Sequence, residues 1–241
     1  MKNINDPSQN PYFSSHAEDY ADQIMATQPT FYKNSGALLD AHLPAGGAVL
    51  DVGNGGVINY DYRRLSRLDC ADLAVSKHAV KKYQDVSTIR FLQADATALT
   101  NISDSQYDAV IVQALLHHLA GRTFAETRSR VCAAVSECLR VLKPGGKLLI
   151  VESTVTPWFE WIERLTYPLM QGFFALSHFG YVYQFSPKSL HQLLVQLMKQ
   201  VPASSLTEGQ NIDVGPHIWI MGRRLPSWLT PCGVTFYVLE K

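Results

Sequence analysis

The sequence V-L-D-V-G-N-G-G-V-I-N-Y-D-Y, residues 49–62, joins a short apolar run to a turn that is rich in glycine. The apolar run reaches Asp51, and Gly53, Gly55 and Gly56 follow within a few positions. Glycine has no Cβ atom, so such a turn lets a bound molecule approach the backbone closely. Ordinary tight turns also contain glycine, so the surrounding sequence decides what this turn does.

Apolar runs of strand length recur from residue 47 onward, and segments with helical periodicity separate them. The runs are apolar on both faces, as expected of strands buried between two layers of helices. A helix predicted over 122–142 ends before Pro144, and another begins at Ser186-Pro187. This alternation indicates an α/β fold with a doubly wound, mostly parallel sheet. The predicted strands cover 47–52, 67–73, 89–94, 107–112 and 147–152.

The C-terminal region differs from the rest of the chain. Two apolar runs, 217–224 and 234–240, are joined by a short loop that contains two prolines. A connection of roughly ten residues without helical periodicity favours antiparallel pairing, because a parallel connection normally needs a helix. We therefore predict that these two runs form an antiparallel hairpin at the end of the sheet.

The composition narrows the class of partner. Lysine plus arginine equals aspartate plus glutamate at 21 each, so the chain lacks the positive excess of a nucleic-acid binder or a polybasic membrane anchor. The polar N-terminal sequence lacks the apolar core of a signal peptide, which predicts a cytoplasmic chain. Four cysteines without C-x-x-C spacing predict free thiols and no metal site.

Polar side chains recur where the predicted strands end. Asp72 closes the second run, at a spacing from Gly53 where a carboxylate accepts hydrogen bonds from ribose hydroxyls. Asp95 closes the third run, and Gln113 follows the fourth. Because the carboxyl ends of parallel strands meet at one rim, these groups and the glycine turn predict a cofactor site there.

Five ordered segments within residues 49–152 resemble the S-adenosylmethionine-dependent methyltransferases that have a seven-stranded Rossmann-like sheet. The segments are V-L-D-V-G-N-G-G, L-D-C-A-D-L-A-V-S-K-H-A-V, F-L-Q-A-D-A-T-A-L, Y-D-A-V-I-V-Q-A-L-L-H-H-L and L-R-V-L-K-P-G-G-K-L-L-I-V-E. The resemblance implies a small-molecule methyltransferase that uses S-adenosyl-L-methionine, with a seven-stranded sheet and an antiparallel C-terminal hairpin.

The resemblance also implies which residues contact the cofactor. Carboxylates would accept from its hydroxyl, amino and ammonium groups, and glycines would leave room for it. The implied set comprises Asp51, Gly53 and Gly55 at the methionine end, Asp72 at the ribose, Asp95 and Ala96 at the adenine, Gln113 near the methyl group, and Asn54, Leu73 and Tyr20 as further contacts.

One position departs from the family's D-x-G-x-G-x-G turn. Val57 stands where the family has its last glycine, and Gly56 comes one residue early. We expect a turn remodelled around Gly55 and Gly56. The alternatives are a narrower methionine pocket and a non-catalytic module with a degenerate cofactor site. A nicotinamide dehydrogenase is a further alternative, which the segments after the second strand disfavour.

Residues 153–185 form an insertion before the next helix, and ten aromatic residues fall within the 28 positions 158–185. Loops at this rim build substrate pockets in α/β sheets, so we predict a helical, aromatic-rich lid over an apolar or aromatic small molecule. The stretch 165–187 has no charged residue, yet its prolines, glycines and glutamines make it a poor membrane span. Contact with a membrane interface is the less favoured alternative.

Methyl transfer from a sulfonium is an in-line displacement, and alignment in a dry site lowers its barrier by about 7–11 kcal/mol relative to dilute reactants. A hydroxyl acceptor benefits from a base, and histidine suits neutral pH. His178 is the first candidate for this base, and His118 and Tyr183 complete the predicted catalytic set. We predict O-methylation in secondary metabolism. The alternative acceptor is a lipid or quinone-like molecule at the membrane face.

These boundaries predict one methyltransferase domain over residues 1–241. No G-x-S-x-G motif supports a hydrolase, and the sequence predicts neither the oligomeric state nor the identity of the acceptor. The predicted parts are an N-terminal helical cap at 1–45, a cofactor-binding core at 46–152, a substrate lid at 153–185, and the last helix with the closing hairpin at 186–241.

Overall fold

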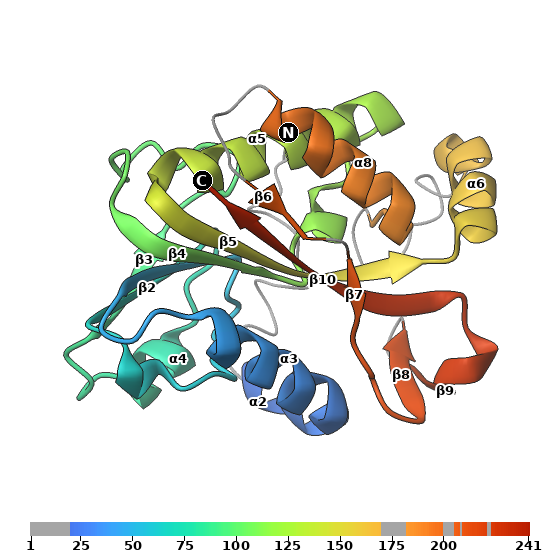
Figure 1. The fold of residues 1–241 in the computed structure, drawn as a ribbon. Coiled ribbons are helices and arrows are strands. Elements are labelled where there is room, and N and C mark those ends of the chain that lie inside the picture. Colours follow the sequence, from blue (N-terminus) through green and yellow to red (C-terminus); the bar gives the residue numbers. More distant parts are fainter. Residues whose placement is uncertain (1–19, 170–181, 200–204, 208, 221–222) are drawn as a thin grey trace, which may run out of the picture.

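The computed structural model of the protein describes residues 20–169, 182–199, 205–207, 209–220 and 223–241. A central sheet contains the strands β1 (Ala48–Val52), β2 (Arg67–Asp72), β3 (Ile89–Gln93), β4 (Tyr107–Gln113), β5 (Leu142–Val155), β6 (Ser205–Leu206), β7 (Gln210–Asn211) and β10 (Cys232–Glu240). The helices around it are α2 (Tyr20–Thr27), α3 (Pro29–His42), α4 (Lys77–Lys82), α5 (Phe124–Val141), α6 (Pro157–Leu165) and α8 (Pro187–Met198). Figure 1 shows α2, α3 and α4 on one face of the sheet, and α5 and α8 on the other.

The sheet has the order β3-β2-β1-β4-β5-β10-β6, and the first five strands in this order pair in parallel. This confirms the predicted α/β, doubly wound, mostly parallel sheet. The register aligns the carboxyl ends of the parallel strands, because Val52 pairs with both Ala71 and Val112, and Gln113 pairs with Val151. The residues that follow these strands therefore meet at one rim of the sheet.

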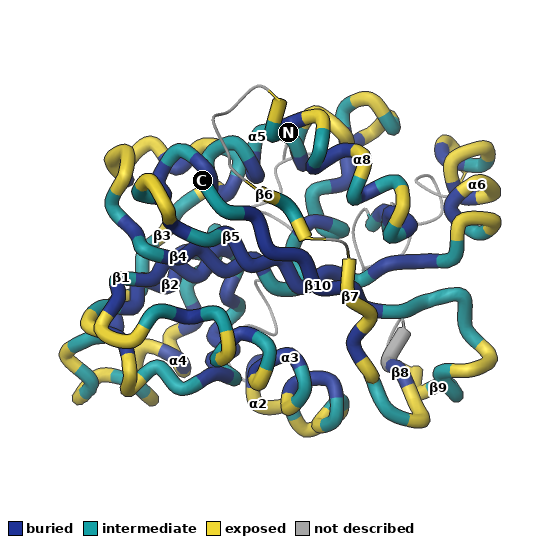
Figure 2. Tube along the Cα trace, in the orientation of Figure 1, coloured by how far each residue is buried: buried dark blue, intermediate teal, exposed yellow. Residues whose placement is uncertain are grey.

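Apolar side chains leave each strand alternately on its two faces, and each face has its own core. On β1, Leu50 joins the cluster that contains Leu139 of α5 and Leu194 of α8. Its neighbour Val49 joins the cluster that contains Leu39 of α3. All five side chains are fully buried, and burying each one stabilises the fold by about 1.5–3 kcal/mol. The central strands β1, β4 and β10 are accordingly buried over most of their length (Figure 2).

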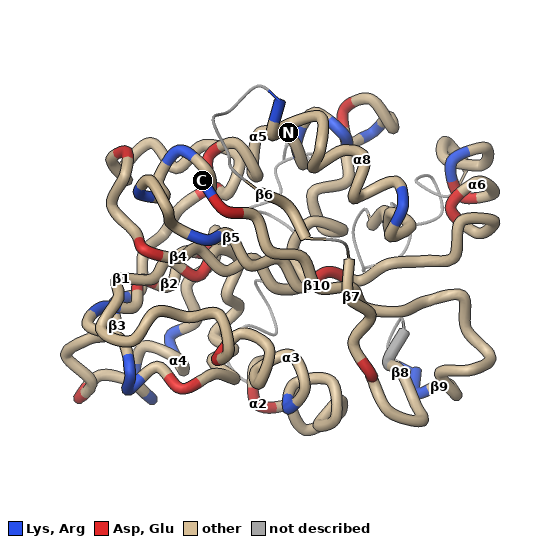
Figure 3. The backbone as a smooth tube through the Cα atoms, viewed as in Figure 1, with Lys and Arg blue, Asp and Glu red and all other residues tan. Residues whose placement is uncertain are grey.

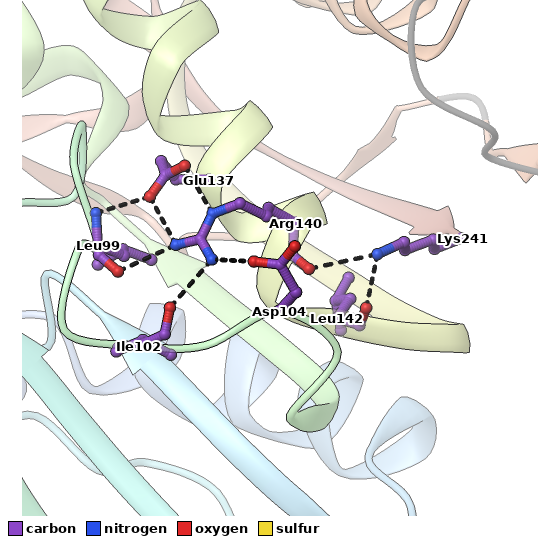
Figure 4. Close-up of polar contacts among 7 residues, drawn as sticks. All are labelled: Leu99, Ile102, Asp104, Glu137, Arg140, Leu142 and Lys241. Atoms are coloured by element: carbon purple, nitrogen blue, oxygen red, sulfur yellow. Dashed lines mark hydrogen bonds and ion pairs between the residues drawn. The ribbon is translucent and has the colours of Figure 1, made fainter.

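Arg140, near the end of α5, ties the loop before β4 to the helix (Figure 4). Its guanidinium donates to the carbonyl groups of Leu99 and Ile102, each at 3.0 Å, and pairs with Glu137 at 2.8 Å. Glu137 also accepts from the Leu99 N–H at 2.8 Å, and the Lys241 ammonium donates to the Arg140 carbonyl at 3.3 Å. This network fastens the amino end of β4, which is the end opposite the rim.

The sequence predicted the wrong partner for the last strand, although it correctly predicted that this strand pairs antiparallel. β10 pairs antiparallel with β5 over its whole length, from Cys232↔Val155 to Glu240↔Lys147. The described part of 217–224 does not pair with it. Instead, β8 (His217–Ile220) pairs with β9 (Arg223–Pro226) in a separate two-stranded sheet. The apolar pattern missed β9 because that strand has two arginines and a proline, whereas β10 is apolar enough to lie inside the main sheet.

The insertion predicted at 153–185 is described in part. β5 continues to Val155, α6 follows it, and the chain is next described from Val182 onward into α8. His178, the first candidate for a base, lies outside the described residues. Among the residues that are described, none of the helices combines the length and the apolar character needed to cross a bilayer.

Candidate functional site

The turn after β1 is closed by its own side chains. Asn54 donates to the carboxylate of Asp51 at 2.7 Å and to the carbonyl of Val57 at 2.8 Å. The Val57 N–H donates back to the Asn54 carbonyl at 2.9 Å. The three glycines of the turn have φ angles between 57° and 82°, a left-handed region that favours glycine. Side-chain and backbone hydrogen bonds therefore define the shape of this turn.

Val57 does not narrow the rim, because its side chain is buried in the core beside α3. Gly56 lies against α4, where a Cβ atom would come within 3.0 Å of the Ala79 methyl. At Gly53, a Cβ atom would come within 2.6 Å of the Leu115 side chain. Gly56 thus serves the packing of α4, and a remodelled cofactor turn stays a prediction.

Asp51 is a buried carboxyl group that organises this turn. Besides Asn54, its Oδ2 atom accepts from the hydroxyl of Tyr60 at 2.7 Å. Burial raises the pKa of Asp51 to about 7, although both hydrogen bonds act in the opposite direction. The structure places this carboxyl group on protein donors behind the turn, and Tyr60 is a partner that the sequence analysis did not identify.

Asp72 joins the end of β2 to the turn after β1. One of its oxygens accepts from the Gly55 N–H at 2.9 Å, and the other accepts from the Ala74 N–H at 3.0 Å. Burial raises the pKa of Asp72, and these backbone donors lower it. Each carboxylate oxygen has a second lone pair, so Asp72 retains capacity to accept from the hydroxyl groups of a ligand.

A cavity of about 360 Å³ lies beside the ends of β2 and β3. Leu73 and Ala98 supply apolar wall, and Asp95, Thr100 and Asn101 supply polar groups. The volume falls within the range of about 300–1,000 Å³ that small-molecule sites occupy. Two residues predicted from sequence, Leu73 and Asp95, are therefore brought to one cavity at the rim.

Asp95 and Ala96 differ in their exposure. Asp95 is exposed, and its Oδ1 atom accepts from the N–H and the hydroxyl of Thr97 at 2.8 and 2.7 Å. Ala96 is buried in the core. The exposed carboxylate can accept from the amino group of a purine, while Ala96 holds the loop against the sheet.

Gln113 carries an acceptor without a partner. Its side-chain N–H₂ donates to Asn59 at 3.2 Å, whereas its Oε1 atom is buried and has no hydrogen-bond partner among the described residues. Asn59 is held in turn by the Tyr32 carbonyl and the Ser35 hydroxyl, both at 2.9 Å. Leaving a buried acceptor unpaired costs about 1–3 kcal/mol, so this atom fits a ligand that donates to it, such as an ammonium group.

The backbone is strained where it leaves β4. Ala114 has a φ of 52°, which is unusual for a residue with a side chain, and its N–H donates to the Val151 carbonyl at 2.8 Å. Such strain is found at functional sites, where the surrounding structure enforces it. The strained residue directly follows the unpaired Gln113, so both features mark the same point on the rim.

Glu152, near the carboxyl end of β5, is a buried residue that the sequence analysis missed. Its carboxylate accepts from His117 Nδ1 at 2.5 Å and from the Leu116 and Ser153 N–H groups at 2.7 and 2.8 Å. A carboxylate that accepts from Nδ1 leaves Nε2 of the neutral imidazole as a proton acceptor. The sequence contained one signal of this role, because the acidic Glu152 directly follows the apolar run 148–151 of the strand.

Of the predicted catalytic residues, His118 is partly buried and Tyr183 is fully buried. Burial lowers the pKa of His118 well below its usual range, so its imidazole is neutral at neutral pH. Tyr183 packs against Phe124 and Phe185 and donates its hydroxyl to Glu160 at 3.1 Å. Its hydroxyl is therefore already used inside the protein. Tyr20 begins α2, and its side chain is outside the described part of the structure.

Comparison with known proteins finds a family that matches part of this chain. Residues 50–150 match the family described as a methyltransferase domain. A demethylmenaquinone methyltransferase from Leptospira interrogans is 30% identical over 92 residues, which are 37% of this chain and 33% of that protein. The ubiquinone/menaquinone biosynthesis C-methyltransferase UbiE from Wigglesworthia glossinidia brevipalpis is 27% identical over 144 residues, 56% of this chain and 53% of that one. The matches thus span between a third and about half of these relatives.

Solved structures extend the likeness over almost the whole chain. The 1,6-didemethyltoxoflavin-N1-methyltransferase from Burkholderia thailandensis, with bound 1,6-didemethyltoxoflavin and S-adenosylhomocysteine, has a TM-score of 0.62 at 16% identity and covers 97% of this chain and 87% of that one. The N-methyltransferase NodS from Bradyrhizobium japonicum, in complex with S-adenosylhomocysteine, has a TM-score of 0.61 at 13% identity and covers 98% and 99%. At these identities the likeness establishes the fold.

The protonation of Asp51 should make the free energy of unfolding of the protein depend on pH. Its pKa is about 7 in the folded state, above the ordinary value near 4, so Asp51 stabilises the fold most at low pH and loses that contribution as the pH rises towards 7. The variant Asp51→Asn cannot titrate. Between about pH 5 and about pH 7, its free energy of unfolding should fall by about 2 kcal/mol less than that of the wild type.

Urea unfolding at several pH values measures this difference. The control is Asp85→Asn, since Asp85 is an exposed aspartate outside the turn. Parallel curves for the wild type and Asp51→Asn would contradict the raised pKa.

Proposed function

We propose that the protein transfers a methyl group from S-adenosyl-L-methionine to a small apolar or aromatic acceptor, because residues 50–150 match the methyltransferase-domain family and the fold is that of the Rossmann-like S-adenosylmethionine-dependent methyltransferases. The unpartnered Oε1 atom of Gln113 carries this proposal, since it presents a buried acceptor at the rim. The cofactor, when bound, supplies a methyl group attached to a sulfonium centre.

The residues at the rim match the donors of this cofactor from one end to the other. Gln113 Oε1 would accept from the ammonium group at the methionine end, and the Asp72 carboxylate from the ribose hydroxyls. Asp95 would accept from the adenine amino group, with Leu73 as an apolar wall of the same cavity. These groups lie at the ends of β4, β2 and β3, and the parallel register brings these ends to one rim.

Among the described histidines, the geometry of His117 best suits a base for a hydroxyl acceptor. The buried Glu152 carboxylate fixes its ring through Nδ1, which leaves Nε2 to take a proton. His117 follows β4 three residues after the strained Ala114, and its side chain is only partly buried. His178, outside the described residues, remains a second candidate.

A second candidate reaction is methylation of a ring carbon of a quinone-like acceptor. The two curated relatives carry quinone-directed names, which favours this acceptor class, although each is matched over no more than about half of its length. O-methylation of a small phenol remains our first expectation. Both acceptors are apolar rings, so both fit an aromatic-rich insertion after β5.

Calorimetric titration with S-adenosylmethionine and S-adenosylhomocysteine tests cofactor use. Asp72→Ala should weaken binding of both about 10- to 100-fold, since it removes hydrogen bonds to the ribose and to the turn. Asp85→Ala, an exposed aspartate away from the rim, is the control and should bind like the wild type. A wild-type protein that binds neither molecule would favour the non-catalytic alternative.

Incubation with S-adenosylmethionine and either a small phenol or a demethylated quinone distinguishes the two acceptors. Mass spectrometry of the product locates the new methyl group on oxygen or on carbon. We expect an O-methylated phenol, and methylation of the quinone ring alone would replace this expectation with the second candidate.

The role of His117 follows from the pH dependence of turnover. His117→Ala should lower kcat about 100-fold with an O–H acceptor, since general-base catalysis contributes about 10²–10⁴-fold. Affinity for S-adenosylmethionine should not change. His217→Ala, on the separate β8–β9 sheet, is the matched control. Full activity with an unaltered pH profile in His117→Ala would remove this residue as the base.

A further inference from the structure

Helix α6 has the reverse of the usual polarity for a surface helix. Its acidic side chains face inward, since Glu160 and Glu163 are each 7% exposed. Its large apolar side chains face outward, since Trp158 and Trp161 are 60% and 66% exposed. A surface helix normally buries its apolar face and exposes its charged face. This reversed polarity suits a helix whose outer face lies in an apolar environment.

Hydrogen bonds to α8 fix α6 in this orientation. The Glu160 carboxylate accepts from the Ser189 hydroxyl at 2.7 Å and from the Ser186 N–H at 3.0 Å, at the start of α8. It also accepts from the Tyr183 hydroxyl. Turning the indoles inward would break all three bonds and expose the core beneath, so the outward face is a stable feature of the fold.

The exposed apolar residues of this segment form one stripe. Trp158, Trp161, Ile162 and Leu165 follow the i, i+3, i+4, i+7 spacing that places side chains on one face of a helix. All four are exposed, and Leu169 in the next turn is 76% exposed. An exposed stripe of this kind marks an interaction surface.

A second apolar element lies close to the start of α6. The short turn η4 (Ser227–Leu229) carries Trp228, which is 82% exposed, and Leu229, which is also exposed. The Thr156 N–H, directly before α6, donates at 2.8 Å to the carbonyl of Pro231, two residues after this turn. Figure 1 shows both elements beyond the same end of the β5–β10 pair.

The exposed charges within these two segments are positive. In 157–169, Arg164 is the exposed charged residue, because both glutamates are buried. Its guanidinium lies over the Phe124 ring, 4.4 Å from the centroid. In 223–231, the charged residues are Arg223 and Arg224, both exposed on β9 (Figure 3). These two segments expose indoles, leucines and arginines but no carboxylate. They therefore suit a partner whose interior is apolar and whose boundary is negatively charged.

We propose that α6 and η4 dock the protein on a lipid bilayer that contains anionic headgroups. The indoles and leucines enter the interface, where tryptophan is favoured, and the arginines pair with lipid phosphates. A second copy of this chain would bring the same positive charges together, which disfavours self-association through this face. The proposal concerns a surface outside the cofactor site and does not depend on methyl transfer.

Vesicle cosedimentation of the full chain tests the docking. Phosphatidylcholine vesicles with added phosphatidylglycerol should bind the wild type more tightly than phosphatidylcholine vesicles, and salt should weaken the difference. The double variant Trp158→Gln/Trp161→Gln should bind vesicles at least about tenfold more weakly than the wild type, because it loses two apolar side chains from the interface. Val80→Gln is the matched control, since Val80 is an exposed apolar residue on α4.

A second variant separates charge from apolar contact. Arg223→Gln/Arg224→Gln should lower binding to the anionic vesicles and leave binding to phosphatidylcholine vesicles unchanged. Trp228→Gln provides a variant outside α6 that should also weaken vesicle binding, and circular dichroism checks that each variant keeps the wild-type melting temperature. A wild type that does not bind either vesicle overturns the proposal. Dimers in sedimentation velocity that the tryptophan variant abolishes, without vesicle binding, would assign the face to self-association instead.

Discussion

The parallel alignment of β1, β2 and β4 is the constraint on which the candidate site depends. It places the turn after β1 beside the end of β2, where the Gly55 N–H donates to the Asp72 carboxylate at 2.9 Å. Gly55 has a φ of 57°, so a residue with a side chain would adopt this conformation only with strain. One carboxylate therefore fixes the turn and still has lone pairs for a ligand, and a shift in register would separate these two functions.

Hydrogen bonds from polar side chains stabilise the turn in which Val57 stands at the place of the family's last glycine. Asn54 bonds to both ends of its own turn, and Tyr60 covers the carboxyl group of Asp51. The core gains the buried Val57 side chain, and it also takes in a buried acid whose pKa rises to about 7. Hydrogen bonds behind the rim thus define its shape, and Asp72, Gln113 and Asp95 are the groups that we propose to contact the ligand.

Short-range signals predicted much of the fold because neighbouring residues determine them. The helix that ends before Pro144 and the cap at Ser186 are present, and the Ser186 hydroxyl accepts from the Ser189 N–H at 3.3 Å. The partner of β10 was not predictable in this way, because pairing depends on competition among distant strands. Tyr60 and Glu152 were missed for a similar reason, since their roles come from burial beside groups that only the folded chain brings near.

β5 connects the two surfaces that the proposals concern. Its Val151 pairs with Gln113 at the rim, and four residues later Val155 leads into α6. Because β5 runs parallel to β4, the helix with the exposed indoles emerges from the same edge of the sheet that carries the strained Ala114. A bilayer in contact with α6 would therefore lie on the side of the molecule that the rim faces. An apolar acceptor dissolved in that bilayer would then lie on the rim side of the molecule, which links the docking surface to the choice of acceptor.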